Sequence, residues 1–347
     1  MNKPYFIAEV GVNFYDTAKV ENISPLEAAK RYIKEAKKAG ADAVKFQAYK
    51  ADTIVSKNSP AYWDLDEEPT KTQYDLFKRH DGFNKEEYQQ LAEYCKKMDI
   101  GFMATPFDFE SADFLEELMD IYKISSSDLS NLPFIRYIAK KGKPILLSVG
   151  AAFLSEIEEA VRVIKEEGVN DICLMHCVLS YPTKYEDANL NVIKTLRKVF
   201  PDLKVGYSDH TLPDETMSIL TCAFLYGAEI IEKHFTLDKN LKGNDHYHAG
   251  DKIDIERAIR NFEKVCIASG RCEKRVLQCE EMARKQARRS IVVIKDMKKG
   301  ERIFEKNVMF KRPGTGISPQ DIDVLLGKAV NRDITADTVL TWDMFLE

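Results

Sequence analysis

The sequence predicts an α/β protein, a (β/α)8 barrel followed by a small β-rich domain. Three observations favour this fold class. Eight short apolar runs alternate with amphipathic helical patterns over about 265 residues, the usual length of such a barrel. Several of these runs end in polar residues, as strands do where a barrel opens into a site. After Gly270 the pattern changes to charged residues and then to short β-like runs separated by turns.

The expected strands are short apolar runs, in chain order Tyr5–Val10, Asp42–Gln47, Gly101–Ala104, Ile121–Ser125, Pro144–Val149, Asp171–Cys177, Leu203–Tyr207 and Glu229–Glu232. The first expected helix follows Ser24 and Pro25, an N-cap serine with proline at the first helical position, and ends at Gly40. The other expected helices are about 84–98, 132–140, 154–166, 190–200, 213–225 and 253–268. The stretch 51–83 is expected to be irregular, and its length is typical of a functional loop or lid.

A doubly wound open sheet is the alternative fold. It normally carries a glycine-rich turn after the first strand, and Gly11-Val12-Asn13 does not continue as G-x-G-x-x-G. The barrel is therefore favoured. We assign residues 1–270 to the barrel, 271–284 to a charged helical linker and 285–347 to the β-rich domain.

The composition excludes several classes of protein. A chain of 347 residues that is 44% hydrophobic and 31% charged is typical of an ordinary soluble globular protein. A net charge of −5 with mixed signs gives no reason to expect nucleic acid or a membrane surface as a partner. The amino-terminal segment does not resemble a signal peptide, and we expect a cytoplasmic protein. Seven cysteines without a C-x-x-C pair indicate reduced thiols, with Cys173 and Cys177 buried for structural reasons.

Two histidines follow successive apolar runs. His210 comes after the seventh expected strand and His234 after the eighth. If these strands are neighbours in a parallel barrel, the two imidazoles can converge on one divalent metal. The alternative is that each histidine separately caps a strand or bonds to the backbone. The repetition of the pattern favours the metal.

Two lysines lie inside expected strands, where a barrel is normally filled with aliphatic residues. A buried ammonium group needs an anion, so Lys45 and Lys123 either pair with carboxylates such as Glu9 or Asp128 or bind an anionic substrate. Hydroxyl groups suited to a phosphate lie at the ends of nearby strands, namely Thr105, Ser126 and Ser148. Because no P-loop is present, the phosphate would belong to a substrate. Together with the histidines, these residues indicate metal-assisted carbon–carbon bond chemistry.

Nine short motifs occur in an order and spacing that we associate with one family. They are IAEVGVN (7–13), VKFQ (44–47), ATPFD (104–108), YKISSSD (122–128), LSVG (147–150), MHCVLSYP (175–182), GYSDHT (206–211), EKHFTLD (232–238) and GNDH (243–246). On these motifs the chain resembles the sialic acid synthase family. The segments SIVV, KKGE and KRPGTGI, between residues 290 and 317, resemble that family's antifreeze-like (SAF) domain. The resemblance covers nearly the whole chain.

The resemblance implies that phosphoenolpyruvate condenses with the aldehyde of a 2-acetamido hexose to give a nine-carbon 2-keto-3-deoxy sugar acid and phosphate. It implies a divalent cation, Mn²⁺ or Mg²⁺, bound by His210 and His234 and acting as a Lewis acid on the aldehyde oxygen. Lys45 and Lys123 would hold the carboxylate and phosphate of phosphoenolpyruvate, with donors from the three hydroxyls Thr105, Ser126 and Ser148.

The same resemblance gives roles to further residues. Glu9 would position or deprotonate a water molecule, and Glu232 would orient metal-bound groups or contact the sugar. Asp128 stands where the family usually has glutamate. We therefore expect the catalytic residues to be Glu9, Lys45, Asp128 and Glu232, and the sugar-binding residues to be Gln47, Tyr181, Asp245 and Arg312. Arg312 matches an arginine that enters the partner subunit's site, which implies a domain-swapped homodimer.

The sequence departs from the family pattern in three places near the expected sugar site. These are residues 13–16, where Asn-His-x-Gly is usual, residues 177–180, and residues 246–251. The acceptor could therefore be N-acetylmannosamine, its phosphorylated form, or a diacetamido-dideoxy sugar of the legionaminic or pseudaminic type. His246 and His248 could bind a metal, although a sugar-contacting or solvated loop is the preferred interpretation.

Two other classes of protein remain as alternatives. One is a Schiff-base aldolase that uses Lys45 or Lys123 with pyruvate. The other is a non-catalytic sugar-binding or ice-binding protein.

Overall fold

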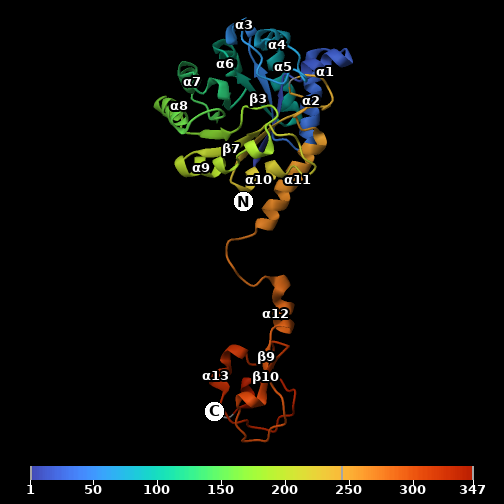
Figure 1. The fold of residues 1–347 in the computed structure, drawn as a ribbon, viewed down its shortest axis with the longest axis vertical. Helices are drawn as coiled ribbons and strands as arrows, with labels where there is room; N and C mark the ends of the chain where they lie inside the picture. The colour runs from blue at the N-terminus through green and yellow to red at the C-terminus, as the bar shows by residue number, and fades with distance from the viewer. Residues whose placement is uncertain (1, 244, 346–347) are drawn as a thin grey trace. The chain divides into compact units, whose positions relative to one another are not determined.

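The computed structural model describes residues 2–243 and 245–345, and the chain forms two compact units, Met1–Gly270 and Arg271–Glu347. In the first unit the helices surround a central set of parallel strands (Figure 1). The second unit contains a small antiparallel sheet. The predicted fold class, a TIM-type barrel followed by a small β-rich domain, is confirmed. None of the helices in the described parts of the chain is long and apolar enough to cross a membrane.

Eight parallel strands make the barrel, in the order β3-β2-β1-β8-β7-β6-β5-β4, with β3 and β4 also next to each other. Their bounds are β1 Tyr5–Gly11, β2 Ala43–Ala48, β3 Gly101–Pro106, β4 Tyr122–Ile124, β5 Ile145–Ser148, β6 Ile172–His176, β7 Lys204–Asp209 and β8 Ile230–His234. Consecutive strands are therefore neighbours, so that the ends of β7 and β8 lie side by side.

The helices of the first unit are α1 Phe14–Glu21, α2 Pro25–Ala39, α3 Ala51–Ile54, α4 Gln73–His80, α5 Lys85–Met98, α6 Phe109–Leu115, α7 Leu132–Ala139, α8 Leu154–Glu166, α9 Asn191–Val199, α10 Ser218–Leu225 and α11 Lys252–Ser269. Their buried faces form the main core with the outward side chains of the strands. Local signals set their ends. Ser24 accepts a hydrogen bond from the Glu27 amide at the start of α2, and Gly40 ends that helix at φ 91°.

Strand alternation divides the inside of the barrel into layers. In β1, β2 and β8, one inward position is apolar (Ile7, Ala43, Ile230) and the inward position two residues later is charged (Glu9, Lys45, Glu232). The apolar layer packs against other inward side chains such as Met103 and Met175. The charged layer therefore lies next to an apolar layer inside the barrel.

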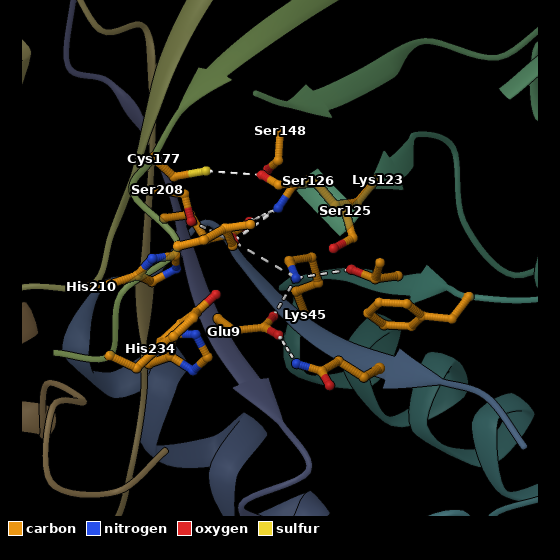
Figure 2. A pocket seen from close by; sticks show the side chains of 16 residues that line it. Glu9, Lys45, Lys123, Ser125, Ser126, Ser148, Cys177, Ser208, His210 and His234 are labelled. Carbon is orange, nitrogen blue, oxygen red and sulfur yellow. Dashed lines mark hydrogen bonds and ion pairs between the residues drawn. The ribbon is translucent and has the colours of Figure 1, made fainter. Parts of the chain in front are cut away.

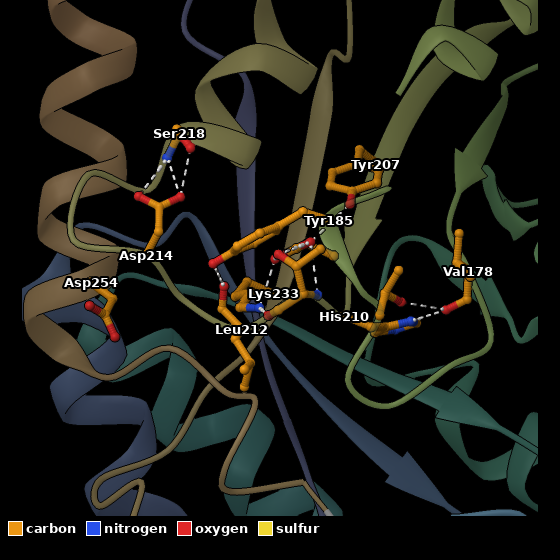
Figure 3. Close-up of polar contacts among 12 residues, drawn as sticks. Val178, Tyr185, Tyr207, His210, Leu212, Asp214, Ser218, Lys233 and Asp254 are labelled. Atoms are coloured by element: carbon orange, nitrogen blue, oxygen red, sulfur yellow. Dashed lines mark hydrogen bonds and ion pairs between the residues drawn. The ribbon is translucent and has the colours of Figure 1, made fainter. Parts of the chain in front are cut away.

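Four segments differ from the sequence-based expectation. The stretch 51–83 contains α3 and α4, so the prediction that it is wholly irregular is wrong. Helices α1 and α6 were not predicted. The helix expected over 213–225 begins only at Ser218, because the Asp214 carboxylate accepts hydrogen bonds from the amides of Thr216 and Ser218 and holds the preceding residues in a turn (Figure 3).

The second unit comprises helix α12 Glu281–Ala287, strands β9 Ser290–Val293 and β10 Val308–Lys311, and helix α13 Ile322–Leu325. The two strands pair antiparallel, and the unit has its own apolar core that includes Ile291, Val293 and Leu340. Arg312 directly follows β10 and is exposed.

Candidate active site

A cavity opens at the carboxyl ends of the barrel strands (Figure 2). It is lined by Glu9, Lys45, Gln47, Thr105, Phe107, Lys123, Ser125, Ser126, Ser148, Cys177, Leu179, Tyr181, Ser208, His210, Glu232 and His234. Most of these side chains are polar, and they come from all eight strands or from the residues that directly follow them. The cavity is therefore the candidate active site.

Two lysines and two glutamates form a buried network at the base of this cavity. Lys45 Nζ lies 2.6 Å from Glu9 Oε2 and 3.7 Å from Glu232 Oε1. Lys123 Nζ donates hydrogen bonds to both carboxylate oxygens of Glu232, at 2.9 and 3.0 Å. Each lysine thus pairs with a carboxylate, but the partner of Lys123 is Glu232 and not Asp128. The four charges balance one another.

The network shifts the pKa values of the two glutamates in opposite directions. Burial opposes ionisation of Glu232, but Lys123 and Lys45 together outweigh it and lower its pKa to about 2. Burial raises the pKa of Glu9, and the opposing effect of Lys45 is not sufficient to reverse this. Burial also opposes the charge of Lys45, but Glu232 and Glu9 outweigh it and raise the lysine pKa. Glu232 is consequently a fixed anion, whereas Glu9 is the carboxylate that can exchange a proton.

Hydroxyl groups surround the two ammonium groups. Lys45 Nζ donates to Thr105 Oγ1 at 3.0 Å, and Ser208 Oγ donates to Glu232 Oε1 at 2.9 Å. Ser126 Oγ accepts from the Gly150 amide at 2.9 Å and also lies 3.1 Å from Cys177 Sγ. Ser148 is buried in the same wall. Such a set of donors beside two cations suits a phosphate or carboxylate group.

The two predicted metal ligands meet on the other side of the cavity. The ring centroids of His210 and His234 lie 5.5 Å apart, and the Tyr181 ring lies 4.3 Å from that of His210. His210 Nδ1 lies 2.6 Å from the Val178 carbonyl (Figure 3), and because a carbonyl only accepts, Nδ1 carries the proton and Nε2 keeps a free lone pair. Burial lowers the pKa of His210 to about 4 and that of His234 well below its usual value. Both rings are therefore neutral and able to bind a metal.

A third histidine and an aspartate lie close to His234. The possible ligand atoms of His234, Asp245 and His248 all lie within 4.8 Å of one another, and His210 is not part of this group. His234 Nδ1 is buried and has no hydrogen-bond partner among the described residues. Two imidazoles with a carboxylate form a common donor set for divalent transition metals. The residues present thus fit a divalent cation.

Most of the predicted site residues are brought together here, and three are not. Gln47 donates to Glu9 Oε1 at 3.0 Å within the cavity wall. Asp128 does not line the cavity, and its Oδ1 accepts instead from Asn131 at 3.2 Å. Asp245 does not line it either and lies beside His234, with its Oδ2 3.8 Å from His234 Nδ1. Arg312 belongs to the second unit.

Several cavity residues were missed. Ser208 lies two positions before His210 on β7 and faces the same way, so strand alternation could have identified it. Cys177 was interpreted as structural, but it lines the cavity and contacts Ser126 at 3.1 Å. Phe107 and Leu179 lie in loops after strands, where periodicity gives no signal.

Two of the departures from the family pattern contact each other. Asp16 Oδ2 lies 3.4 Å from His246 Nε2, and Asp16 Oδ1 lies 3.8 Å from His80 Nε2. His246 is fully buried, and its Nδ1 lies 2.7 Å from Thr236 Oγ1. His246 is thus a buried, bonded residue and not a solvated one. Asn244 of the GNDH motif lies outside the described residues.

Comparisons with known proteins agree on one family. The NeuB family model matches residues 32–274, and the SAF domain model matches residues 288–346. An uncharacterized protein from Methanocaldococcus jannaschii is 39% identical over 343 residues, covering 99% of this chain and 94% of that protein. The N,N'-diacetyllegionaminic acid synthase of Legionella pneumophila is 36% identical, covering 98% and 94%. The crystal structure of an N-acetylneuraminic acid (sialic acid) synthetase from Leptospira borgpetersenii in complex with citrate is 34% identical. It matches with a TM-score of 0.69 over 81% of this chain and 90% of that one.

Proposed function

The chain belongs to the NeuB family and is an enzyme of the sialic acid synthase class, and on that premise we propose that it joins phosphoenolpyruvate to the open-chain aldehyde of a 2-acetamido hexose. The product is a nine-carbon 2-keto-3-deoxy sugar acid, and phosphate is released. One observation carries the proposal. Two lysines, two carboxylates, several hydroxyls and two histidines face a single cavity at the strand ends.

The lysine side of the cavity is assigned to phosphoenolpyruvate. Lys45 and Lys123 are held in place by Glu9 and Glu232 before any substrate arrives, so little ordering is needed when an anion binds. The four charges already balance, so the bound substrate must compete with the glutamates. It replaces some of the hydrogen bonds that each lysine donates to its glutamate. Hydroxyl donors such as Ser126 then complete the shell around the phosphate.

Glu9 is assigned to the water that attacks the former enol carbon. Its raised pKa makes it a better base near neutral pH than an ordinary glutamate, whereas Glu232 is held ionised by its lysines. Glu9 orients and deprotonates the water, and the resulting tetrahedral carbon expels phosphate. Asp128 lies outside the cavity wall and is given no part in this step.

The histidine side is assigned to the aldehyde. A divalent cation, Mn²⁺ or Mg²⁺, bound at His210 and His234 would supply Lewis acidity toward the aldehyde oxygen. The contact between His210 Nδ1 and Val178 fixes the tautomer of that ring and directs Nε2 away from the backbone. Tyr181 packs on the same ring and limits its rotation.

The structure disfavours the Schiff-base alternative. A lysine that attacks a carbonyl must be neutral, and enzymes achieve this by lowering its pKa. The pKa of Lys45 is instead raised by Glu232 and Glu9, which outweigh the effect of burial. Borohydride should therefore trap no pyruvate or phosphoenolpyruvate on the protein.

A phosphate-release assay tests the proposed function. Purified chain is incubated with phosphoenolpyruvate and a panel of aldehydes, namely N-acetylmannosamine, its 6-phosphate and a 2,4-diacetamido-dideoxy hexose, with and without Mn²⁺. The identity to a legionaminic acid synthase supports the diacetamido sugar as the first acceptor to test. We expect phosphate release only when an acceptor is present, and we expect a chelator to stop it. Phosphoenolpyruvate binding without phosphate release for any acceptor contradicts the proposal and favours a binding protein.

Arg312 is assigned to the acceptor in a partner subunit's site, within a domain-swapped homodimer. Arg312→Ala should raise the acceptor KM about 10-fold or more and leave the phosphoenolpyruvate KM unchanged, because a guanidinium contact to the sugar is lost. The matched control is Arg332→Ala, which removes another exposed arginine of the same unit, paired with Asp343.

Mixed dimers test the swap directly. Arg312→Ala protomers have an intact barrel, and Lys123→Met protomers have an intact second unit. If Arg312 acts in the partner's site, refolding the two variants together restores one complete site per mixed dimer and a substantial fraction of the activity. No recovery above the separate variants contradicts the exchange of arginines between subunits.

A further inference from the structure

Beside the cavity, the loop after β8 brings a small group of metal-ligating side chains together. His248 Nε2 lies 3.9 Å from Asp245 Oδ1, and His234 Nδ1 lies 3.8 Å from Asp245 Oδ2. The ring centroids of His234 and His248 are 4.9 Å apart. His234 therefore has one nitrogen turned toward this loop, and its ring also borders the cavity that contains His210.

His248 is unusual among the buried histidines in the described residues. It is fully buried, and neither of its ring nitrogens has a hydrogen-bond partner. His176, by comparison, bonds to the Ala188 carbonyl at 3.0 Å, and His246 bonds to Thr236. Leaving a buried polar group unsatisfied costs about 1–3 kcal/mol. A ring with two unsatisfied nitrogens indicates that something else binds there.

The spacing of the group fits a metal ion. The separations of 3.8 and 3.9 Å are too long for hydrogen bonds. Two ligand atoms that each lie about 2.1 Å from one ion can be separated by at most about 4.2 Å. The nitrogen–oxygen distances fall within this limit. The side chains thus leave a gap that an ion would close with only small movements.

We propose that Asp245 and His248, together with His234, are protein ligands of a divalent cation in this chain, in a group of ligand atoms that does not include His210. The proposal rests on the proposed function for the role of the ion, but it concerns only which side chains hold it. Two imidazoles and a carboxylate favour Co²⁺, Fe²⁺ or Zn²⁺ over Mg²⁺, because imidazole is a softer ligand than water or carboxylate. The loop that departs most from the family pattern would then select the metal.

The test measures binding of the metal alone to the full chain after chelator treatment. Titration calorimetry with Co²⁺ and with Mg²⁺, and the visible absorption of bound Co²⁺, are compared between the wild type, His248→Leu and Asp245→Asn. Leucine keeps much of the histidine volume, and asparagine keeps the shape of aspartate. Thermal melts confirm that each variant is folded, and His246→Gln serves as the control for a buried histidine of the same loop that lies outside the group.

We expect both substitutions to lower Co²⁺ affinity by about 100-fold or more, since even indirect partners of a metal ligand are worth 10–100-fold. His248→Leu should weaken Co²⁺ binding more than Mg²⁺ binding and change the Co²⁺ spectrum, whereas His246→Gln should do neither. Unchanged Co²⁺ affinity in His248→Leu and Asp245→Asn overturns the proposal. An equal loss in His246→Gln also overturns it, because the loop fold and not the ligands would then be responsible.

These outcomes are separate from those of the phosphate-release assay. Metal binding that depends on His248 in a chain that never releases phosphate supports the ligand set and rejects the proposed function. Phosphate release together with a metal affinity that does not change in His248→Leu supports the proposed function and rejects the ligand set.

Discussion

Replacing Lys123 with methionine should lower the rate of phosphate release by roughly 10²–10³-fold, the usual loss when one preorganised charge-stabilising donor is removed. Lys123 is 4% exposed and is the ammonium group closest to Glu232. Its removal takes a positive charge from the phosphate side of the cavity and leaves the Glu232 carboxylate opposed mainly by Lys45, at 3.7 Å. The phosphoenolpyruvate KM should rise as well, because the same group binds the ground state.

The pH dependence separates this electrostatic effect from a general loss of structure. In the wild type, Lys123 and Lys45 outweigh burial and hold the pKa of Glu232 at about 2. Without Lys123, burial is opposed less strongly and the pKa of Glu232 rises. The acid limb, which the base Glu9 sets, should move to higher pH as well, because the Glu232 carboxylate raises the pKa of Glu9 and is neutralised less without Lys123. Lys141→Met is the control, since Lys141 pairs with Asp113 and Glu116 outside the cavity and should leave both rate and pH profile unchanged. A loss of activity in Lys123→Met with an unaltered pH profile would contradict the assigned coupling to Glu232.

The residues that sequence reasoning found share one property, which is that regular structure places them. Glu9, Lys45 and Glu232 lie inside strands, where a charge at an inward position is conspicuous against the apolar alternation. His210 and His234 were found because the same pattern recurs at the ends of two strands. The alternation of apolar and polar residues and the order of the strands along the chain were sufficient to predict these positions and the barrel.

The residues that it missed or misjudged depend on contacts between distant loops. Nothing in the spacing of Asp16 and His246 predicts that they meet, and Asp128 was predicted to be catalytic, whereas its carboxylate accepts from Asn131 and does not line the cavity. The interpretation of His248 as a sugar-contacting or solvated residue could not include its complete burial, since burial in a loop leaves no periodic signal. The proposed metal ligands Asp245 and His248 lie in such a loop, which is why the reaction class was easier to predict from the sequence than they were.

Replacing Lys233 with methionine should destabilise the barrel by about 3–5 kcal/mol, the usual cost of leaving one partner of a buried ion pair alone. Lys233 is fully buried, and its Nζ lies 2.7 Å from Asp209 Oδ2 (Figure 3). Asp209 also accepts hydrogen bonds from the Tyr207 hydroxyl at 2.9 Å and from the Thr211 amide at 3.1 Å. Denaturant unfolding followed by circular dichroism measures the loss. Lys204→Met is the control, because Lys204 forms a half-exposed ion pair with Asp171. It should lower the free energy of unfolding by less than about 1 kcal/mol.

The same pair links stability to the site, because Asp209 and Lys233 directly precede His210 and His234 on adjacent strands. Their side chains point away from the cavity, as strand alternation requires, and bond β7 to β8 where the two imidazoles begin. The double variant Lys233→Met with Asp209→Leu should recover only part of the lost stability, since no buried charge is then left alone but the Tyr207 hydroxyl and the Thr211 amide lose their acceptor. It should not recover full Co²⁺ affinity if the ion pair is what fixes the position of His234. Full recovery of both would show that the pair serves stability alone and that the histidines are positioned by other contacts.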